Sequence, residues 1–298
     1  MKRYLPIIAI VLIFVVGLGI LCYPLVSSVI NNIGIRNEAK IENETIENMD
    51  DDRVKTLLAE AETYNESLLS KIILTDPFDE ESYATIGANY EESFNVNENG
   101  LIGYVDIPKI NVYLPIYHGT STEVLSRGSG HLQNTAFPIG GADTHSVISA
   151  HTAFPTETFF DYLTDMEEGD YFFIHVLNRV LTYQVDQIKV VEPDDTHDLY
   201  VQEGRDLVTL LTCTPYSINS HRLLVRGTRV EDVDPESLTT VSGGNNYFFF
   251  LGYKITFLMA TIVIIAFLTV VAGVVILSLR LRKKGRGPAV KKDGDDSA

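Results

Sequence analysis

Residues 206–230 read DLVTLLTCTPYSINSHRLLVRGTRV. The flanking stretches 206–212 and 222–230 are rich in Leu, Val and Thr, whereas the segment between them contains Pro215 and Asn219. Apolar runs bounded by turn residues predict two strands joined by a loop. If these strands pair antiparallel with Cys213 opposite Arg222, both side chains emerge on the same face. The stretch therefore predicts β-structure that presents a thiol beside a cation.

Cys213 is one of only two cysteines in the 298 residues, and the other, Cys22, lies in a long apolar run. The polar part of the chain thus offers Cys213 no partner for a disulfide. A thiol beside a fixed cation, with histidines available upstream, is how a cysteine nucleophile is built. We therefore predict that Cys213 is catalytic and that Arg222 is its neighbour. A buried, inert cysteine is the alternative.

A thiol nucleophile also needs a proton partner, for which the chain offers seven histidines. His151 follows the strand-like stretch 145–150, and strand ends followed by loops are where a rigid scaffold presents catalytic groups. Strand alternation turns His221 away from the face that Arg222 occupies. These arguments favour His151 but leave the others open, namely His118, His131, His145, His175, His197 and His221.

The region from Gly103 onward consists of short apolar runs separated by Pro, Gly, Asn and Asp. Only residues 158–166 have helical spacing between these runs. Many short strands with a single helix predict a mainly β fold, either a barrel or a sandwich. The predicted strands cover residues 103–107, 112–117, 144–150, 171–176, 180–191, 206–212 and 222–230.

The segment that precedes this region is helical in character. Residues 36–71 are polar, acidic and almost free of Gly and Pro, with apolar side chains at helical spacing. They predict one or two amphipathic helices. Asp76-Pro77-Phe78 interrupts the pattern, because the residue before a proline is disfavoured in a helix.

Both ends of the chain carry apolar segments. Residues 4–30 are almost wholly apolar and residues 255–279 lack charge; each run exceeds the roughly 20 residues that a helix needs to cross a bilayer. Lys2 and Arg3 precede the first run, and a cluster of Lys and Arg over residues 280–286 follows the second. The positive-inside bias predicts that both termini are cytoplasmic and that the intervening region lies outside the cell.

A cleaved signal peptide is the alternative for the first run, although its apolar stretch is long for one and no small-residue cleavage site follows. The predicted organisation is an anchor over 1–30, a helical extension over 31–100 and a β-barrel over 101–232. A linker over 233–254, a membrane helix over 255–279 and a cytoplasmic tail over 280–298 complete it.

The charge of the outer region limits its partners. Residues 31–246 hold 37 of the 40 Asp and Glu but only 13 of the 23 Lys and Arg. A region this acidic repels phosphates, which argues against nucleic acid and favours peptide or protein partners. Spacings typical of metal ligands do not stand out, and we predict neither a metal nor a cofactor.

Several blocks of the sequence resemble sortases, the cysteine transpeptidases of Gram-positive surfaces. TLLTC at 209–213, Arg222 nine residues on, and SAH at 149–151 are similar to the sortase signature. The resemblance runs over about residues 101–230, and Ser217 departs from it, since relatives commonly carry Gly there. Further blocks are GYVDIP at 103–108, YHGT at 117–120, GHL at 130–132, HSVISAH at 145–151, GD at 169–170 and CTPY at 213–216.

This resemblance implies a sortase-like β-barrel in which Cys213 attacks the Thr-Gly bond of an LPxTG-like sorting signal and forms a thioacyl enzyme. His151 would protonate the leaving amine and later deprotonate the incoming one. Arg222 would stabilise the oxyanion, and Thr212 would support the substrate or the oxyanion. Whether Cys213 and His151 rest as a neutral pair or as an ion pair stays open.

Two features resemble the pilus-assembling branch, class C: the C-terminal apolar segment and the DPF motif at 76–78, which matches that branch's lid. The resemblance implies that Asp76 pairs with Arg222, Pro77 fixes the backbone and Phe78 covers the thiol. It also implies pilins or other surface proteins as substrates, with a pilin lysine as acceptor. A housekeeping sortase that uses a cell-wall precursor and a non-catalytic, membrane-tethered receptor are the alternatives.

Overall fold

The structure is a computed structural model. It describes residues 12–20, 23, 27, 30–31, 34–35, 46, 49–68, 76–78, 90–91, 93–96, 99–154, 157–231, 247–250, 253–256, 258–259, 261–262, 264–265, 267–269, 272–273, 276 and 280. The chain divides into two compact units. One comprises residues 22–245, and the other comprises residues 1–21 together with 246–298.

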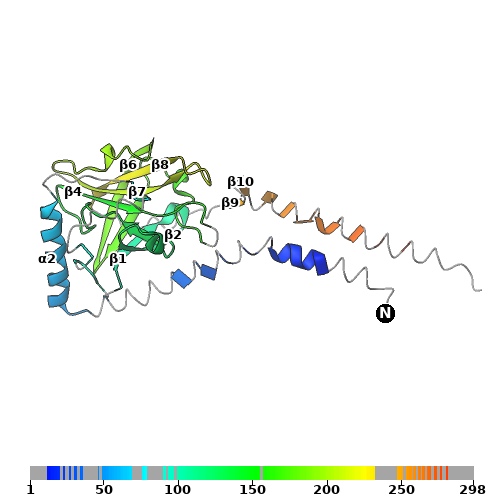
Figure 1. The fold of residues 1–298 in the computed structure, drawn as a ribbon, viewed down its shortest axis with the longest axis horizontal. Helices are drawn as coiled ribbons and strands as arrows, with labels where there is room; N and C mark the ends of the chain where they lie inside the picture. The colour runs from blue at the N-terminus through cyan, green and yellow to red at the C-terminus, as the bar shows by residue number, and fades with distance from the viewer. Residues whose placement is uncertain are drawn as a thin grey trace, which may run out of the picture. The chain divides into compact units, whose positions relative to one another are not determined.

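Among the described residues of the first unit, eight strands close into a barrel (Figure 1). Around it the strands follow the order β1-β2-β3-β4-β7-β8-β6-β5, and β5 returns to pair with β1. Neighbouring strands are antiparallel, except that β2 with β3 and β4 with β7 are parallel. The strands are β1 (Leu101–Ile107), β2 (Val112–His118), β3 (Ser129–His131), β4 (Thr144–Ser149), β5 (Tyr171–Val176), β6 (Arg179–Val191), β7 (Asp206–Thr214) and β8 (His221–Val230).

The barrel confirms the prediction of a mainly β fold. The seven predicted strands coincide with β1, β2 and β4 to β8, with ends shifted by one or two residues. The short strand β3 was not among them, because three residues carry too little alternation to indicate a strand. A few short helical turns connect the strands: η2 (Pro108–Ile110), α3 (Thr122–Leu125), η3 (Leu163–Asp165) and η4 (His197–Leu199).

The prediction of a helix over residues 158–166 is wrong. Only η3, a single 3-10 turn, forms there. The Asp161 carboxylate accepts hydrogen bonds from the backbone N–H groups of Ala153 and Phe159, at 3.0 and 3.1 Å. An Asp side chain that binds nearby backbone groups competes with helix formation, and here it holds the segment in turns.

Aromatic packing inside the barrel explains a glycine in β8. Phe172 on β5 and Tyr183 on β6 stack with their ring centroids 5.6 Å apart, and both side chains are fully buried. A Cβ atom at Gly227 would lie 2.5 Å from the Phe172 ring and 2.9 Å from Tyr183. Gly227 therefore lets the strand that carries Arg222 approach this aromatic pair closely.

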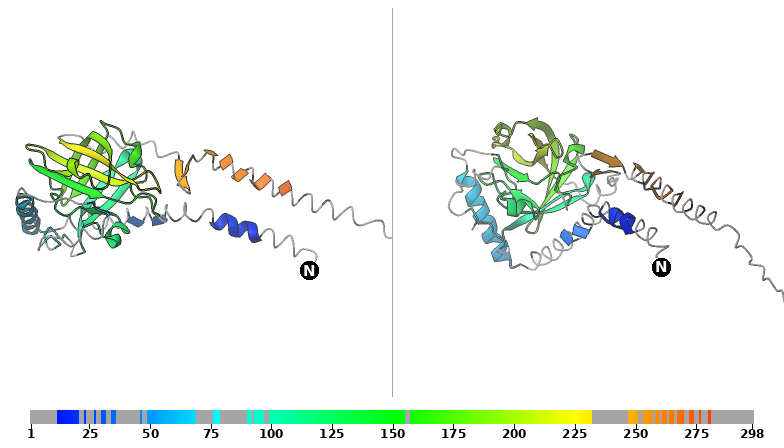
Figure 2. Two further views of the ribbon diagram at one scale, coloured as in Figure 1. Left: turned by 45° about the horizontal axis from the view of Figure 1, so that its top comes forward. Right: turned by 45° about the vertical axis from the view of Figure 1, so that its right-hand side comes forward.

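Helix α2 (Asp51–Ser67) lies against the outside of the barrel (Figure 2). Asp50 caps its first turn by accepting a hydrogen bond from the Asp52 N–H. Near its C-terminal end, Asn65 exchanges two hydrogen bonds with the Phe137 backbone, at 3.2 and 2.7 Å. The prediction of an amphipathic helix is thus confirmed for residues 51–67; much of the remainder of 36–71 lies outside the described residues.

In the second unit, residues 12–20 are helical. Strands β9 (Tyr247–Phe250) and β10 (Tyr253–Thr256) form an antiparallel hairpin. The prediction of a helix from residue 255 is therefore wrong for residues 255 and 256, because the aromatic and β-branched residues here favour a strand.

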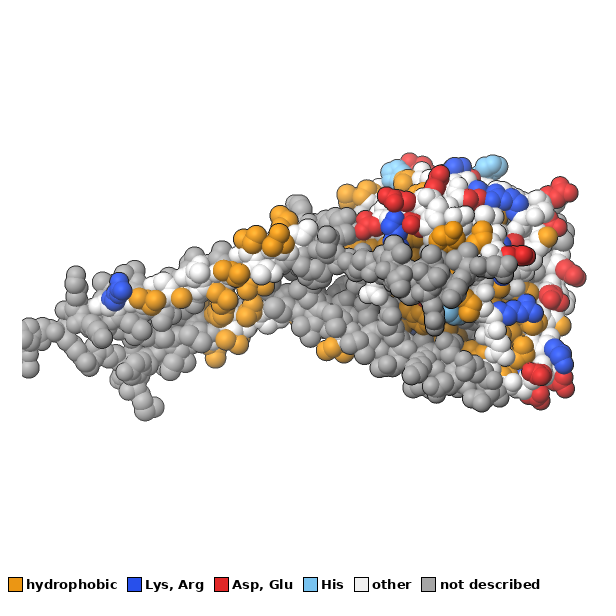
Figure 3. All heavy atoms as spheres, turned by 180° about the vertical axis from the view of Figure 1, so that it is seen from behind, with side chains coloured by type: hydrophobic (Ala, Val, Ile, Leu, Met, Phe, Trp, Pro, Cys, Tyr) orange, Lys and Arg blue, Asp and Glu red, His pale blue; other side chains and the backbone are white. Residues whose placement is uncertain are grey.

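The predicted membrane helices, 1–30 and 255–279, are described only in part. Within the described part of the chain, no helix combines the length and apolarity needed to span a bilayer. Apolar side chains at described positions of both segments are exposed, and Figure 3 colours them orange. They include Leu12, Ile13, Val15, Leu258, Ile262 and Phe267.

Candidate active site

Cys213 lies near the C-terminal end of β7, directly opposite Arg222 of β8. Directly paired residues of an antiparallel ladder project on the same face with their Cβ atoms about 5 Å apart. The predicted register of the hairpin is therefore confirmed. Cys213 is 8% exposed and Arg222 is 9% exposed, so the thiol and the guanidinium form a largely buried pair.

The parallel pairing of β4 with β7 determines which histidine lies at the same end of the barrel. Ser149, the last residue of β4, pairs with Leu211, and the Ala150 N–H donates to the Leu211 carbonyl at 3.1 Å. His151 follows directly. Because parallel strands run in the same direction, the C-terminal ends of β4 and β7 bring His151 and Cys213 to one end of the barrel.

Thr212 strengthens this alignment. Its hydroxyl donates to the Ala150 carbonyl at 2.7 Å, which ties the residue before Cys213 to the residue before His151. Its predicted contact with the substrate or the oxyanion stays a prediction.

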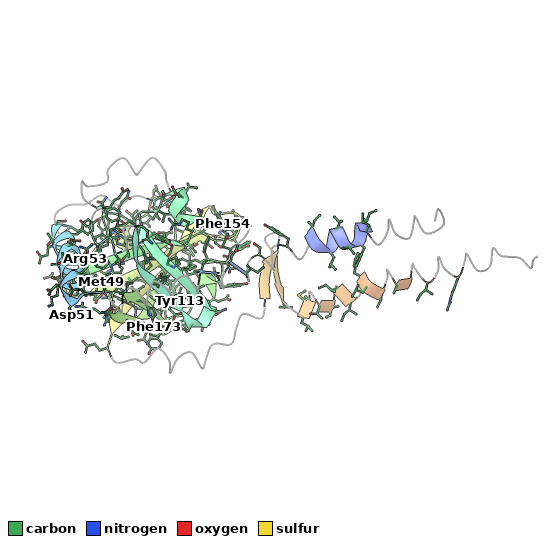
Figure 4. The ribbon with its side chains drawn as sticks, turned by 90° about the horizontal axis from the view of Figure 1, so that it is seen from below. Met49, Asp51, Arg53, Tyr113, Phe154 and Phe173 are labelled. Carbon is green, nitrogen blue, oxygen red and sulfur yellow. The ribbon has the colours of Figure 1, made fainter. Side chains whose placement is uncertain are left out.

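The His151 side chain is half-buried and packs against aromatic rings. Its ring centroid lies 5.6 Å from that of Phe78 and 5.6 Å from that of Phe154, with interplanar angles of 32° and 17°. Figure 4 labels Phe154, which lies on the side of this unit away from Asp51 and Arg53 of α2. Burial lowers the pKa of His151, because a desolvated imidazole disfavours its charged form.

The Asp76 carboxylate forms an ion pair with the Arg222 guanidinium. Its two carboxylate oxygens accept from Nε at 2.9 Å and from a terminal nitrogen at 2.6 Å, the bidentate geometry typical of strong Arg–carboxylate pairs. The other terminal nitrogen of Arg222 donates to the carbonyls of Asn219 and His221, both at 3.1 Å. Four hydrogen bonds from two segments of the chain therefore hold Arg222 in one orientation.

Pro77 and Phe78 continue the segment across the site. Pro77 is buried, and the Phe78 N–H donates to Asp76 Oδ1 at 3.3 Å. The Phe78 ring centroid lies 5.2 Å from the Arg222 guanidinium carbon. It also packs against a cluster of buried aliphatic side chains that includes Leu199 and Leu211. Residues 76–78 thus contact both predicted partners of Cys213, as the sequence predicted for Asp76.

The electrostatics of this arrangement favour a neutral thiol. Burial raises the pKa of Cys213 to about 11; the charge of Arg222 opposes the rise and that of Asp76 adds to it. Since His151 has a lowered pKa, the thiol and the imidazole are both uncharged at neutral pH with residues 76–78 in this position.

The other histidines have different surroundings. Burial lowers the pKa of His131 to about 3 and that of His145 to about 4, and both hydrogen-bond through each ring nitrogen. His118 binds the carbonyls of Gly100 and Ser93. His175 lies within ion-pair distance of Asp106, and His221 lies within ion-pair distance of Glu192. His197 begins the short helical turn η4. In the described part of the chain, no group of three or more His, Cys, Asp or Glu side chains gathers as a metal site.

Three residues at the site were not predicted from the sequence: Phe154, Asp161 and Tyr216. Phe154 stacks on His151. Asp161 is buried, and a hydrogen bond joins its side chain to that of Tyr216, three residues after Cys213. Burial raises the pKa of Asp161 to about 6. Tyr216 belongs to the CTPY block that resembles sortases. Asp161 lies in no such block, and no local sequence pattern indicates a role for it.

Comparison with known proteins identifies relatives of this site and fold. A family model described as a sortase domain matches residues 105–230. Sortase D of Bacillus subtilis is 30% identical over 150 residues, which cover 49% of this chain and 73% of that protein. Sortase A of Streptococcus agalactiae is 27% identical over 117 residues, or 38% of this chain and 47% of that protein.

Solved structures of sortase C proteins are more similar. The Streptococcus pneumoniae sortase C structure is 42% identical with a TM-score of 0.58, and the match covers 67% of this chain and 99% of that one. Sortase C-1 of Actinomyces oris is 43% identical with a TM-score of 0.55, over 60% of this chain and 99% of that one.

Proposed function

Because this chain belongs to the sortase family of cysteine transpeptidases and fits its class C members, we propose that it polymerises pilins. The reaction would cleave an LPxTG-like sorting signal between Thr and Gly and join the Thr carbonyl to a lysine amine of another pilin. The observation that carries the proposal is the pairing of Cys213 with Arg222 on strands that neighbour β4, which leads to His151 two residues after its end. Family membership favours an enzyme over the alternative of a receptor.

In the first half-reaction, the Cys213 thiol gives its proton to His151, and the thiolate sulfur attacks the carbonyl carbon of the Thr-Gly bond. The negative charge that develops on the carbonyl oxygen needs a fixed donor, which Arg222 supplies. When the tetrahedral intermediate collapses, the C–N bond breaks and His151 donates a proton to the departing glycine amine. The sorting signal then remains attached to Cys213 as a thioester.

In the second half-reaction, a lysine amine attacks the thioester carbon. His151, now neutral, accepts the proton that the amine loses. The C–S bond breaks, Cys213 is regenerated and an isopeptide bond links the two pilins. The excess of Asp and Glu over residues 31–246 attracts a protonated lysine side chain to the enzyme. The ammonium loses one proton to water before the neutral amine attacks.

We further propose that residues 76–78 act as a lid that must leave before the first step. Arg222 cannot stabilise an oxyanion while Asp76 occupies its guanidinium. Departure of the lid removes the charge of Asp76 and exposes the site, which lowers the pKa of Cys213 and raises that of His151. Both changes favour the thiolate–imidazolium pair that attacks the substrate.

The membrane topology predicted from the sequence is part of the proposal. Residues 1–30 and 255–279 would anchor the chain, with residues 31–100 and the barrel over 101–232 outside the cell. Exposed apolar side chains in both segments support this assignment, since soluble surfaces rarely carry such patches. Residues 233–254 would link the barrel to the second anchor, and residues 280–298 would face the cytoplasm.

An assembly assay tests the proposal. The full chain in detergent is incubated with a pilin that carries an LPxTG-like sorting signal, and the products are separated on a denaturing gel. We expect a ladder of pilin multimers, which disappears with Cys213→Ala. Transfer of the pilin to a cell-wall precursor without a ladder would instead identify a housekeeping sortase.

A further inference from the structure

The Asp161 carboxylate lies where the loop after His151 meets the loop after Cys213. Its two oxygens accept from the backbone N–H groups of Ala153 and Phe159, and its side chain is hydrogen-bonded to that of Tyr216. The side chain is buried, so these bonds form away from water. Charge-assisted hydrogen bonds in such surroundings are stronger than those between neutral groups.

The bonds to Ala153 and Phe159 shape the loop that carries His151. Ala153 has a φ of +61°, a left-handed conformation that costs an alanine energy. The Asp161 oxygen holds that conformation through the Ala153 N–H. Phe160, the residue before Asp161, donates its N–H to the His151 carbonyl at 3.0 Å. The loop thereby closes on both sides of His151.

Tyr216 extends the same network to the nucleophile. It lies three residues after Cys213, in a loop where Pro215, Ser217 and Ile218 are exposed while Tyr216 is half-buried. Its hydrogen bond to Asp161 therefore draws this loop toward the His151 loop.

We propose that Asp161 and Tyr216 are positioning residues, whose hydrogen bond keeps the His151 imidazole aligned with the Cys213 thiol. The β4–β7 ladder ends at Ser149 and Leu211. Because His151 lies two residues beyond that end, the ladder alone does not determine the orientation of its side chain. The contact between Phe78 and His151 is lost if the lid leaves. The bridge holds the two loops together from the other side and remains when the substrate arrives.

The inference rests on the proposed roles of Cys213 and His151. Proton transfer is needed at both half-reactions, and a small displacement of a catalytic group is costly, up to about 100-fold in rate for 1 Å. Loss of the bridge is therefore expected to slow the chemical step more than it weakens peptide binding.

Kinetics of bridge variants test the inference. All chains carry Asp76→Ala, so that lid opening does not limit the rate, and amine release from a sorting-signal peptide is followed with the full chain in detergent. The variants are Tyr216→Phe, Asp161→Asn and the double variant. Tyr171→Phe is the matched control, because it too removes a hydrogen-bonded hydroxyl. That hydroxyl accepts from Gln184 at 3.0 Å and lies on β5, which neighbours β1 and β6.

We expect Tyr216→Phe to lower kcat roughly 10- to 100-fold, with KM and the unfolding temperature close to those of the parent and of Tyr171→Phe. Because the two residues act through one bond, the double variant should lose little more than Asp161→Asn alone. Tyr216→Phe retains the Asp161 bonds to the backbone, so it reports on the bridge even if Asp161→Asn fails to fold.

Two outcomes overturn the inference while the proposed function stands: an unchanged kcat in Tyr216→Phe, or a rise in KM alone. Failure of the proposed function has a different signature. In that case the Asp76→Ala parent would release no more amine than its Cys213→Ala derivative, and the bridge would have no catalytic pair to align.

Discussion

Arg222 has two possible partners in one catalytic cycle, and both are anionic. In the structure it binds Asp76 through two hydrogen bonds, and in the proposed reaction it stabilises the oxyanion. The guanidinium is held from behind by the carbonyls of Asn219 and His221, so it can exchange one anion for the other without reorienting. The Asp76 carboxylate therefore occupies the position at the guanidinium that the oxyanion would take during the reaction.

Replacing Asp76 or Phe78 by alanine is expected to speed alkylation of Cys213 by iodoacetamide. Asp76 raises the pKa of the thiol and burial raises it further, so each substitution increases the thiolate fraction at neutral pH. Each unit by which the pKa falls gives about a tenfold faster reaction. The rate is measured as a function of pH on full chains that carry Cys22→Ala, and its midpoint should fall below the value of about 11 of the unaltered site.

Asp198→Ala is the matched control for this experiment, because it removes a carboxylate paired with Lys189 rather than with Arg222. Its labelling rate should equal that of the parent chain. If Asp76→Ala and Phe78→Ala also label at the parent rate, residues 76–78 do not protect the thiol.

At the scale of elements, β4, β7 and β8 determine the site. The parallel β4–β7 pair aligns the ends that carry His151 and Cys213, and the antiparallel β7–β8 pair places Arg222 opposite the thiol. Strands that are buried on both faces have nearly continuous apolar sequences. β7 is such a strand, since it is buried along nearly its whole length. The site therefore depends on packing deep in the barrel.

Gly227→Ala is expected to destabilise the barrel by about 1–3 kcal/mol, because the new methyl group overpacks the Phe172–Tyr183 pair. Urea unfolding of the full chain in detergent measures the change. Thr228→Ala, at the next position of β8, is the matched control, since it adds no volume. Equal stabilities of the two variants would contradict the packing argument.

Sequence alone predicted the elements whose pattern is local. Residues 207–213 form an apolar run of strand length, and the loop residues around Pro215 mark its end. The pairing of Cys213 with Arg222 could therefore be predicted from the sequence. The contacts of Asp161 could not, because its partners Ala153 and Tyr216 are distant in sequence or are backbone groups. The hydrogen bonds of the Asp161 carboxylate to the backbone of Ala153 and Phe159 explain why residues 158–166 have a helical spacing but do not form a helix.

At the scale of the whole molecule, charge and apolarity are segregated along the chain. Carboxylates and fewer cations are scattered over the visible described surface of the barrel-containing unit in Figure 3, as expected from the excess of Asp and Glu over residues 31–246. Exposed apolar side chains gather in the terminal segments. This division suits an enzyme that is held at a membrane and acts on protein substrates outside it.

The most direct test of the central claim is to trap the thioacyl enzyme. The full chain in detergent is mixed with an LPxTG-like peptide, quenched in acid, digested and analysed by mass spectrometry. We predict an adduct on Cys213 with the mass of the peptide fragment that ends at Thr, retained in Cys22→Ala and lost in His151→Ala or Cys213→Ala. An adduct on another residue, or amine release from the Cys213→Ala chain, would contradict the account.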